Sequence, residues 1–337
     1  MRHARIFSLS VFLALLVYGA LGYALLPLAF FEGDLTRLAM LPERQFGWTR
    51  DQPAISPAWL QQSSMRDADV LVIGDSFSMS RVWQSTLTRE GVRVRTDHWD
   101  NLRAVCADLP DHLRQQGFHG RHVVLQVVER NLERVVRDSV ACTQTRHRLK
   151  HPVDGVQSPP AQHFKPDQID DHSGRLSVGV RTWLHARELE HKAQAADFSA
   201  WHITPDVRVA RVPDGCRLFS HARCEEALFW AEDRAQDVSP EVAQDMARLA
   251  ARLEGPLPGV TVTWVVVPNK STVYLHPDKQ FWDRSEALVR APNLLRMARR
   301  QLAQHTTDLY LGNNTHFSTA GYLLMGQAIR ETMERAR

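Results

Sequence analysis

The apolar pattern of the chain begins with an unbroken stretch from Ile6 to Phe31 that carries no charged residue. About 20 apolar residues suffice for a helix to span a bilayer. The alternative, a cleaved signal peptide, has an apolar region of roughly 7–15 residues followed by a small-residue cleavage site. Here the apolar run continues well past the small residues at 19–22. The pattern therefore predicts an uncleaved transmembrane anchor over residues 1–32.

Basic residues precede this stretch, among them Arg2 and Arg5. Positive charges beside a span are retained in the cytoplasm, so the chain after the span is predicted to lie on the opposite side. We expect a single-pass protein of the inner (cytoplasmic) membrane whose folded part faces the periplasm or cell exterior.

Beyond the anchor, short apolar runs alternate with amphipathic segments. The runs predict strands at Val70 to Ile73, Val92 to Arg95, His122 to Val128 and Val260 to Val267, and the segments predict helices near 80–89, 102–116 and 240–253. The first run is apolar without alternation, which is typical of a strand covered on both faces. Repeated strand–helix alternation predicts an α/β fold with a doubly wound parallel sheet in a three-layer, flavodoxin-like arrangement.

Two stretches interrupt this alternation. Residues 33–66 contain Pro and Trp in an irregular pattern and are predicted to form a stalk or linker. Residues 137–239 combine basic loops, a Pro-rich piece and one helix near 176–193. We interpret them as a loop-rich cap inserted into an α/β domain that spans residues 67–337.

The first strand runs directly into a Gly-Asp-Ser turn at 74–76. A strand, a sharp turn and a helix that expose a serine are how an α/β enzyme presents a nucleophile. The alternative is an ordinary loop in which Asp75 or Ser76 caps the following helix. This stretch makes Ser76 the candidate nucleophile.

A histidine near the other end of the chain supplies a partner for that serine. Residues 313–316 read Asn-Asn-Thr-His in a polar loop, and Gly-Tyr follows at 321–322. Together with Gly-Asp-Ser at 74–76, this block resembles the SGNH, or GDSL, hydrolase superfamily, whose last block is Asp-x-x-His. The two blocks bracket residues 69 to about 335. The resemblance implies an SGNH-like fold in which Ser76 is the nucleophile and His316 the general base.

The chain departs from the family pattern in two places. The aspartate of the last block is replaced by Asn313, or by Asn314 if the shorter Asp-x-His spacing of the alginate O-acetyltransferase branch applies. An asparagine orients an imidazole but does not supply the charge that stabilises imidazolium. Asn313 is taken as the orienting residue, with Asp308 as the alternative acid. The Gly-x-Asn-Asp block is absent after Val128, where Asn131 is the nearest match to the family's oxyanion asparagine.

Two shorter stretches resemble the membrane-anchored, alginate O-acetyltransferase-like members of the superfamily. One is the Glu-Arg pair at 129–130, and the other is a Pro-x-Lys-x-x-x-Tyr stretch at 268–274. Ligands of doubly wound sheets bind at the carboxyl ends of the strands, where both stretches are predicted to lie. The expected oxyanion or substrate contacts are Asp75, Arg130, Asn131, Lys270 and Tyr274. A solvated loop residue is the alternative for Lys270.

Composition narrows the chemistry further. The net charge is +3 and the basic residues are spread along the chain, so no nucleic-acid partner is predicted. Of the four cysteines, Cys216 and Cys224 could close a small loop in an oxidising compartment, which leaves Cys106 and Cys142 as the other pair. The alternative for Cys106 is a buried thiol. No Cys-x-x-Cys or His-x-x-x-His spacing indicates zinc, and no metal or cofactor is expected.

The resemblance implies a periplasmic, membrane-anchored serine acyltransferase that O-acetylates an exported polysaccharide, or another hydroxyl acceptor, through an acyl-serine intermediate. It also implies an acyl donor delivered by a multi-span membrane acyltransferase. Two alternatives stay open: an esterase that resolves the acyl-enzyme with water, and a catalytically degenerate domain that binds glycan or a membrane partner.

Overall fold

A computed structural model describes residues 2–148, 150, 158–159, 161–162, 176–233 and 235–335. The chain forms two compact units. Among the described residues, unit 1 contains 2–51, 176–231 and 311–315, and unit 2 contains the remainder. Each unit is therefore built from segments that are distant in sequence. Part of the predicted insertion, residues 163–175, lies outside the described residues.

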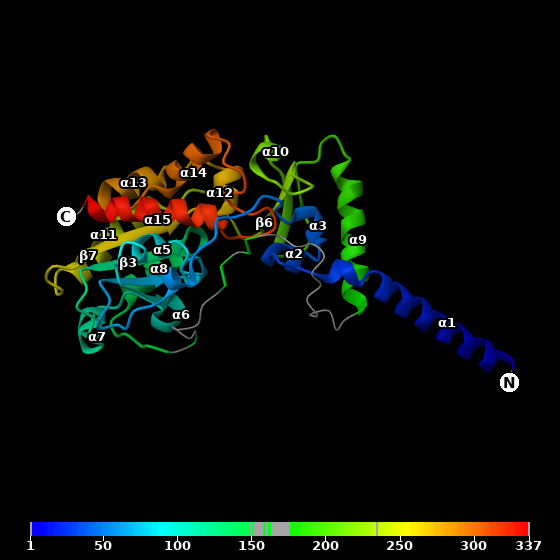
Figure 1. Cartoon of the computed structure of the whole chain (residues 1–337), viewed down its shortest axis with the longest axis horizontal. Coiled ribbons are helices and arrows are strands. Elements are labelled where there is room, and N and C mark those ends of the chain that lie inside the picture. Colours follow the sequence, from blue (N-terminus) through cyan, green and yellow to red (C-terminus); the bar gives the residue numbers. More distant parts are fainter. Residues whose placement is uncertain are drawn as a thin grey trace. The chain divides into compact units, whose positions relative to one another are not determined.

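Unit 2 contains a parallel sheet of four strands (Figure 1). Its members are β1 (Val70–Gly74), β2 (Val94–His98), β3 (His122–Val128) and β7 (Thr261–Val267), in the order β2-β1-β3-β7. Every residue of β1 and β3 is buried, which explains why these segments are apolar without alternation. The prediction of an α/β fold with a parallel sheet is confirmed. The second strand begins two residues later than predicted, at Val94.

Helices connect and cover these strands. They are α4 (Ser76–Met79), α5 (Ser85–Thr88), α6 (Trp99–Leu102), α7 (Leu109–Gln115), α8 (Glu129–Ala141), α11 (Pro240–Glu254), α12 (Lys270–Tyr274), α13 (Phe281–Leu288), α14 (Leu294–Ala303) and α15 (Thr319–Glu334), with a 3₁₀ turn η2 (Pro57–Leu60). Because β2 and β7 lie on opposite sides of the β1 and β3 pair, right-handed crossovers place α5 and α8 on opposite faces of the sheet. Helix α15 packs on α5, and α11 packs on α8.

Of the helix predicted near 80–89, only α5 forms, and the short helix α4 precedes it. Arg81 lies between them with φ of +58°, a left-handed conformation that ends a right-handed helix. The break leaves Ser76 at the first position of a four-residue helix directly after β1.

Unit 1 is built around a sheet that the sequence analysis did not predict. Strands β4 (Ala200–His202), β5 (Val207–Arg211) and β6 (Glu226–Trp230) form an antiparallel sheet in that order. Its helices are α1 (Arg2–Ala24), α2 (Asp34–Ala39), α3 (Glu43–Phe46), α9 (Leu176–Ala193) and α10 (Gly215–Leu218), with a 3₁₀ turn η1 (Leu26–Ala29). The inserted segment is therefore more regular than a loop-rich cap.

The core of unit 1 corrects the predicted stalk. Leu35 and Phe46, from α2 and α3, are fully buried in one cluster with Leu189, Val207 and Leu228. Residues 34–46 thus pack into unit 1 instead of linking two parts, and the chain from residue 52 onward belongs to unit 2. Burial of the apolar side chains of residues 34–46 against those of α9, β5 and β6 provides the driving force for this packing.

Helix α1 is different in character, because Gly22 is its only buried residue. A core helix would be covered by its own protein, whereas α1 is not. In the part of the chain that the structure describes, it is the one helix long and apolar enough to cross a membrane. Its length and composition fit the predicted span.

All four cysteines form disulfides. Cys106 pairs with Cys142 in unit 2, and Cys216 pairs with Cys224 in unit 1. This is the pairing that the sequence left as one of its alternatives. Gly215 is required beside the second disulfide, because a Cβ there would lie 2.2 Å from the backbone oxygen of Cys224.

Candidate active site

Ser76 and His316 meet in unit 2. The Nε2 atom of His316 lies 2.8 Å from the Oγ atom of Ser76, which is within hydrogen-bond distance. Ser76 begins α4 at the carboxyl end of β1, and His316 precedes α15. The ring of Phe77 packs against the imidazole with its centroid 4.7 Å away. A hydroxyl within hydrogen-bond reach of an imidazole is the arrangement of a nucleophile and its general base.

The Gly-Asp-Ser turn has this shape because Asp75 is tied to β3. The Asp75 carboxylate accepts hydrogen bonds from the backbone N–H of Val128 at 2.7 Å and from Nε2 of Gln126 at 2.8 Å. It also caps α4 by accepting from the N–H of Phe77 at 3.0 Å. Gly74 is needed because a Cβ would lie 2.4 Å from Oγ of Ser78. Asp75 therefore positions Ser76, and the sequence expectation of an oxyanion or substrate contact does not fit its three protein donors.

Asn313 is not brought to the imidazole. Its Nδ2 donates to Oε1 of Glu43, and its backbone oxygen accepts from the N–H of Leu35 at 3.1 Å, all within unit 1. Its Oδ1 accepts no hydrogen bond from any residue that the structure describes. An orienting group must accept a hydrogen bond from the Nδ1–H group of the histidine. The expectation that Asn313 orients His316 is therefore wrong, because burial beside Glu43 fixes this side chain elsewhere.

The partner of Asn313 is itself unusual. Glu43 is 3% exposed, and it accepts hydrogen bonds from Oγ1 of Thr36 and from the N–H of Gly33. Burial raises the pKa of Glu43 to about 7, although its hydrogen bonds oppose the rise. A second contact holds the same loop, since the backbone N–H of Thr315 donates to Oδ1 of Asp34 at 2.9 Å. Residues 311–315, directly before His316, therefore belong to unit 1 and are held there by hydrogen bonds.

Asp308 and Tyr274 lie in the core of unit 2. Asp308 has no exposed surface and a left-handed φ of +55°. The hydroxyl of Tyr274 accepts a hydrogen bond from the N–H of Tyr310 at 3.2 Å. Burial, and then the negative charge of Asp308, raise the pKa of Tyr274. The hydroxyl of Tyr274 therefore has a structural contact in the core, where a contact with substrate had been predicted. Asp308 shares a unit with His316 and stays the candidate acid.

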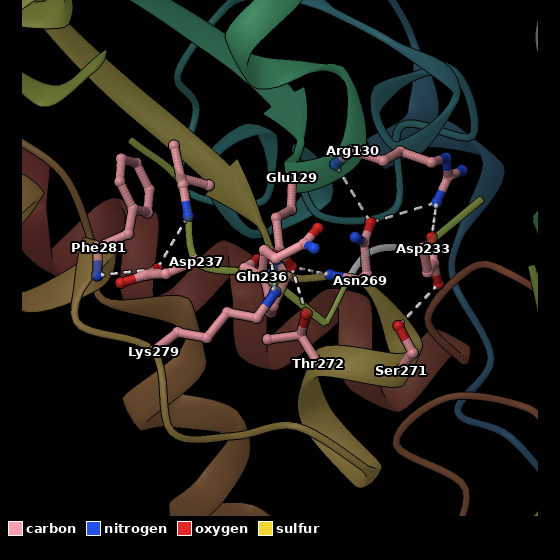
Figure 2. Close-up of polar contacts among 12 residues, drawn as sticks. Glu129, Arg130, Asp233, Gln236, Asp237, Asn269, Ser271, Thr272, Lys279 and Phe281 are labelled. Carbon is pink, nitrogen blue, oxygen red and sulfur yellow. Dashed lines mark hydrogen bonds and ion pairs between the residues drawn. The ribbon is translucent and has the colours of Figure 1, made fainter. Parts of the chain in front are cut away.

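Arg130 is held at the carboxyl end of β3 by two polar partners (Figure 2). Its Nη1 lies 3.4 Å from Oδ1 of Asn269 and 3.4 Å from Oδ1 of Asp233. The other carboxylate oxygen of Asp233 accepts from Oγ of Ser271 at 3.1 Å. The guanidinium is thereby fixed at the sheet edge where Ser76 follows the neighbouring strand. Asn131 follows it in α8 and is partly exposed.

Lys270 begins α12 and is 2% exposed. The alternative of a solvated loop residue is thus excluded by its burial. The structure places Lys270 after β7, at the predicted edge of the sheet, without bringing it into a described contact with Ser76.

Glu129, already marked in the sequence by its place in the Glu-Arg pair, forms the most buried described charged pair at this edge with Lys279, which was not predicted. Glu129 is 5% exposed and accepts hydrogen bonds from Oγ1 of Thr272 at 2.6 Å and from the N–H of Asn269 at 2.8 Å. It also pairs with Lys279, whose Nζ donates to the backbone oxygen of Gln236 at 3.0 Å (Figure 2). Burial raises the pKa of Glu129, and the nearby Lys279 opposes this rise.

A small cleft opens beside this pair. It has a volume of about 150 Å³ and is lined by Glu129, Arg130, Glu133, Gln236, Asp237, Val238 and Asn269. The aligned pairs Gly74 with His98 and Val128 with Val267 show that the carboxyl ends of all four strands lie at one edge. The turn that carries Ser76, the Arg130 network and α12 therefore lie along the same edge of the sheet.

Comparison with known proteins adds nothing to this geometry: no family model, no curated protein and no solved structure matches the chain.

Proposed function

We propose that the protein is a membrane-anchored serine O-acyltransferase of the SGNH type. The observation that carries this proposal is the distance of 2.8 Å between Oγ of Ser76 and Nε2 of His316. The two residues lie 240 positions apart in sequence, so local structure alone does not account for their contact. A domain that only binds a partner has no need for this pair.

The reaction proceeds in two acyl transfers. In the first, Oγ of Ser76 attacks the carbonyl carbon of the donor while Nε2 of His316 takes the hydroxyl proton. The C–O or C–S bond to the donor's leaving group breaks, and His316 returns the proton to that group. In the second, His316 takes a proton from an acceptor hydroxyl, whose oxygen attacks the acyl-serine and releases Ser76 with its proton restored.

Two groups are suited to stabilise the negative oxygen that forms in each step. The backbone N–H of Ser76 is at the first position of α4, where a helix leaves its N–H groups without an intrahelical acceptor. Asn131, partly exposed in α8 at the neighbouring strand end, is the candidate second donor. Donors aimed at the developing oxyanion contribute about 3–4 kcal/mol each in well-studied hydrolases.

Transfer to a sugar hydroxyl, and not hydrolysis, is favoured by the location that the chain indicates. Helix α1 fits a membrane span, and basic residues precede its apolar part. The two disulfides suit an oxidising compartment. An extracytoplasmic enzyme at the inner membrane meets exported polysaccharides, and acyl groups must reach it through the membrane. A multi-span membrane acyltransferase would supply the donor. The esterase is the second candidate, because the same pair of residues also activates water.

The test uses the full chain purified in detergent. With an acetyl ester as donor, wild type should give an acetylated peptide that contains Ser76 by mass spectrometry. Adding an oligosaccharide should divert acetyl groups from water to sugar. Ser76→Ala should abolish both. Ser80→Ala is the matched control, because its buried hydroxyl has no hydrogen-bond partner among the described residues. Equal acetylation of wild type and Ser76→Ala would overturn the proposal, and release of acetate without transfer would favour the esterase.

A further inference from the structure

Helix α9 touches the chain at the point where α1 ends. Gly179 lies so close to this point that a Cβ on it would be 2.2 Å from the backbone oxygen of Leu25. Leu25 directly follows α1, and α9 also packs against η1, which comes next (Figure 1). All three elements belong to unit 1. If α1 spans a bilayer, the first turns of α9 lie where the chain leaves it.

One face of α9 is buried in unit 1. Gly179, Thr182, Ala186 and Leu189 are buried and recur at intervals of three or four residues, which places them on one side of the helix. His185 adds a hydrogen bond to the backbone oxygen of Ala39 at 2.7 Å. This face fixes the orientation of α9 and so determines which side chains point outward.

The opposite face is apolar at the end nearest α1. Trp183 is 41% exposed and Leu184 is 51% exposed, and Val180 on the same side is partly exposed. The guanidinium carbon of Arg187 lies 5.9 Å from the centre of the Trp183 ring. Large apolar side chains gathered on a surface usually mark a binding interface, because their hydration is unfavourable.

The neighbourhood of this face indicates a lipid partner. Tryptophan and tyrosine concentrate at the level of lipid headgroups, and Tyr23, in the last turn of α1, is 77% exposed. Helices that lie on membranes combine Trp and Leu on one side with flanking basic residues, as Trp183, Leu184 and Arg187 do. The contact between Gly179 and Leu25 also places the first turns of α9 beside the end of the apolar helix.

We propose that the face of α9 formed by Val180, Trp183 and Leu184 lies in the headgroup region of the bilayer that α1 spans. Unit 1 is then attached to the membrane at two places, by the span and by this face. Arg187, which pairs with Glu190 at 3.1 Å, lies beside Trp183 at the edge of this face, where basic residues of membrane-surface helices are usually found. The proposal rests on α1 spanning the membrane and is independent of the catalytic proposal.

The experiment compares two leucines of nearly equal exposure. Leu184 is 51% exposed and Leu288, in unit 2, is 52% exposed. Leu184→Cys and Leu288→Cys can each be labelled with an environment-sensitive fluorophore, since all four native cysteines are in disulfides. The labelled full chain is placed in lipid nanodiscs at one copy per disc. A nitroxide-bearing phospholipid should quench the label at position 184 several-fold and leave the label at 288 unchanged.

A measurement without a label uses brominated phospholipid to quench tryptophan. Trp183→Phe should remove a large part of the quenching, whereas Trp59→Phe, at an exposed tryptophan of unit 2, should not. Equal lipid quenching at 184 and 288, with no effect of Trp183→Phe, would overturn the proposal. A label at 184 that is shielded from water but not quenched by lipid would also overturn it and would indicate a protein contact. Alkaline extraction tests the span itself, so a failed anchor is distinguished from a face that points away from lipid.

Discussion

The residues that directly precede His316 in the chain are held by side chains of unit 1. Residues 311–315 precede the histidine, and their contacts are with Glu43 and Asp34 of unit 1. Asn313 and Thr315 are therefore fixed by buried contacts inside unit 1. Substitutions in this loop are therefore expected to change the stability of unit 1.

Asn313→Asp is expected to damage the protein, although the sequence alone would suggest that a restored aspartate helps catalysis. The new carboxylate would face the buried carboxylate of Glu43, and two like charges at that distance cannot both ionise. The loss of the amide donor and the buried repulsion should lower the free energy of unfolding by about 3 kcal/mol. Thermal denaturation followed by circular dichroism measures this loss.

The double variant Glu43→Gln with Asn313→Asp is the control for that prediction. It exchanges donor and acceptor across the same contact, so stability should return toward that of wild type. If Asn313→Asp alone is as stable as wild type and more active on an acetyl ester, then the contact with Glu43 does not govern this residue.

Asp308→Asn tests the remaining candidate for the orienting acid. Asp308 is fully buried in the unit that holds His316, and asparagine tolerates its left-handed φ of +55°. If Asp308 accepts a hydrogen bond from the Nδ1–H group of His316, the change should reduce kcat toward the roughly 10⁴-fold loss that the same change causes in a serine protease. Steady-state kcat and KM on an acetyl ester measure it, with circular dichroism as the check on folding. A loss below threefold would remove Asp308 from the catalytic set.

At the scale of elements, the contact between α3 and the loop at 311–315 should make stability depend on pH. The pKa of Glu43 is raised from 4.5 to about 7 by burial, so the folded state binds a proton more tightly than the unfolded state does. The Glu43 contribution is therefore fully present below pH 4.5 and is lost as pH rises to about 7. Over this pH range, the titration of Glu43 should lower the free energy of unfolding by at most about 3 kcal/mol.

Urea denaturation at a series of pH values checks this sign. Wild type should lose stability between pH 5 and pH 7 relative to Glu43→Gln, in which the group no longer titrates. The variant keeps a hydrogen-bonding amide of the same shape, so its own curve gives the contribution of every other group. Parallel curves for the two proteins would show that Glu43 titrates as an ordinary exposed carboxylate.

Local pattern predicted some elements and not others for a physical reason. The strands β1, β3 and β7 are apolar because both of their faces are covered, and such runs are visible in a sequence. The sheet of unit 1 escaped prediction because β4 has three residues, two of them exposed. Leu35 and Leu228 share one buried cluster although they are far apart in sequence, so no local pattern predicts that they pack together.

The same distinction applies to the site. Ser76 and His316 lie in short motifs whose chemistry a sequence displays, and their contact is present in the structure. The role of Asn313 was misjudged because its partner Glu43 is 270 residues away. Lys279 was missed because an isolated lysine carries no signal until Glu129 is placed beside it. A short motif reveals the residues that it contains. The partners that meet these residues from distant parts of the chain are seen only in the three-dimensional structure.

For the whole molecule, the disulfides and the apolar helix α1 both bear on the cellular compartment in which the folded units lie. If α1 spans the membrane, the basic residues Arg2 and Arg5 before its apolar part predict that the following chain lies outside the cytoplasm. Both units hold one disulfide, and disulfides persist in oxidising compartments. The two features are independent, and each predicts that units 1 and 2 lie outside the cytoplasm.

The last prediction concerns this topology. The protein should stay in the membrane pellet after washing with alkaline carbonate, because a spanning helix is not released by pH or salt. Protease added to spheroplasts should digest the chain beyond about residue 35, while a tag placed before Arg2 should be protected. The disulfide that closes the longer interval, Cys106 to Cys142, is expected to stabilise its unit by about 4 kcal/mol in the chain-entropy account, against about 2.5 kcal/mol for Cys216 to Cys224. Recovery of a soluble form that begins near residue 25 would mean that α1 is a cleaved signal, whereas a protease-resistant chain with reduced cysteines would place both units in the cytoplasm.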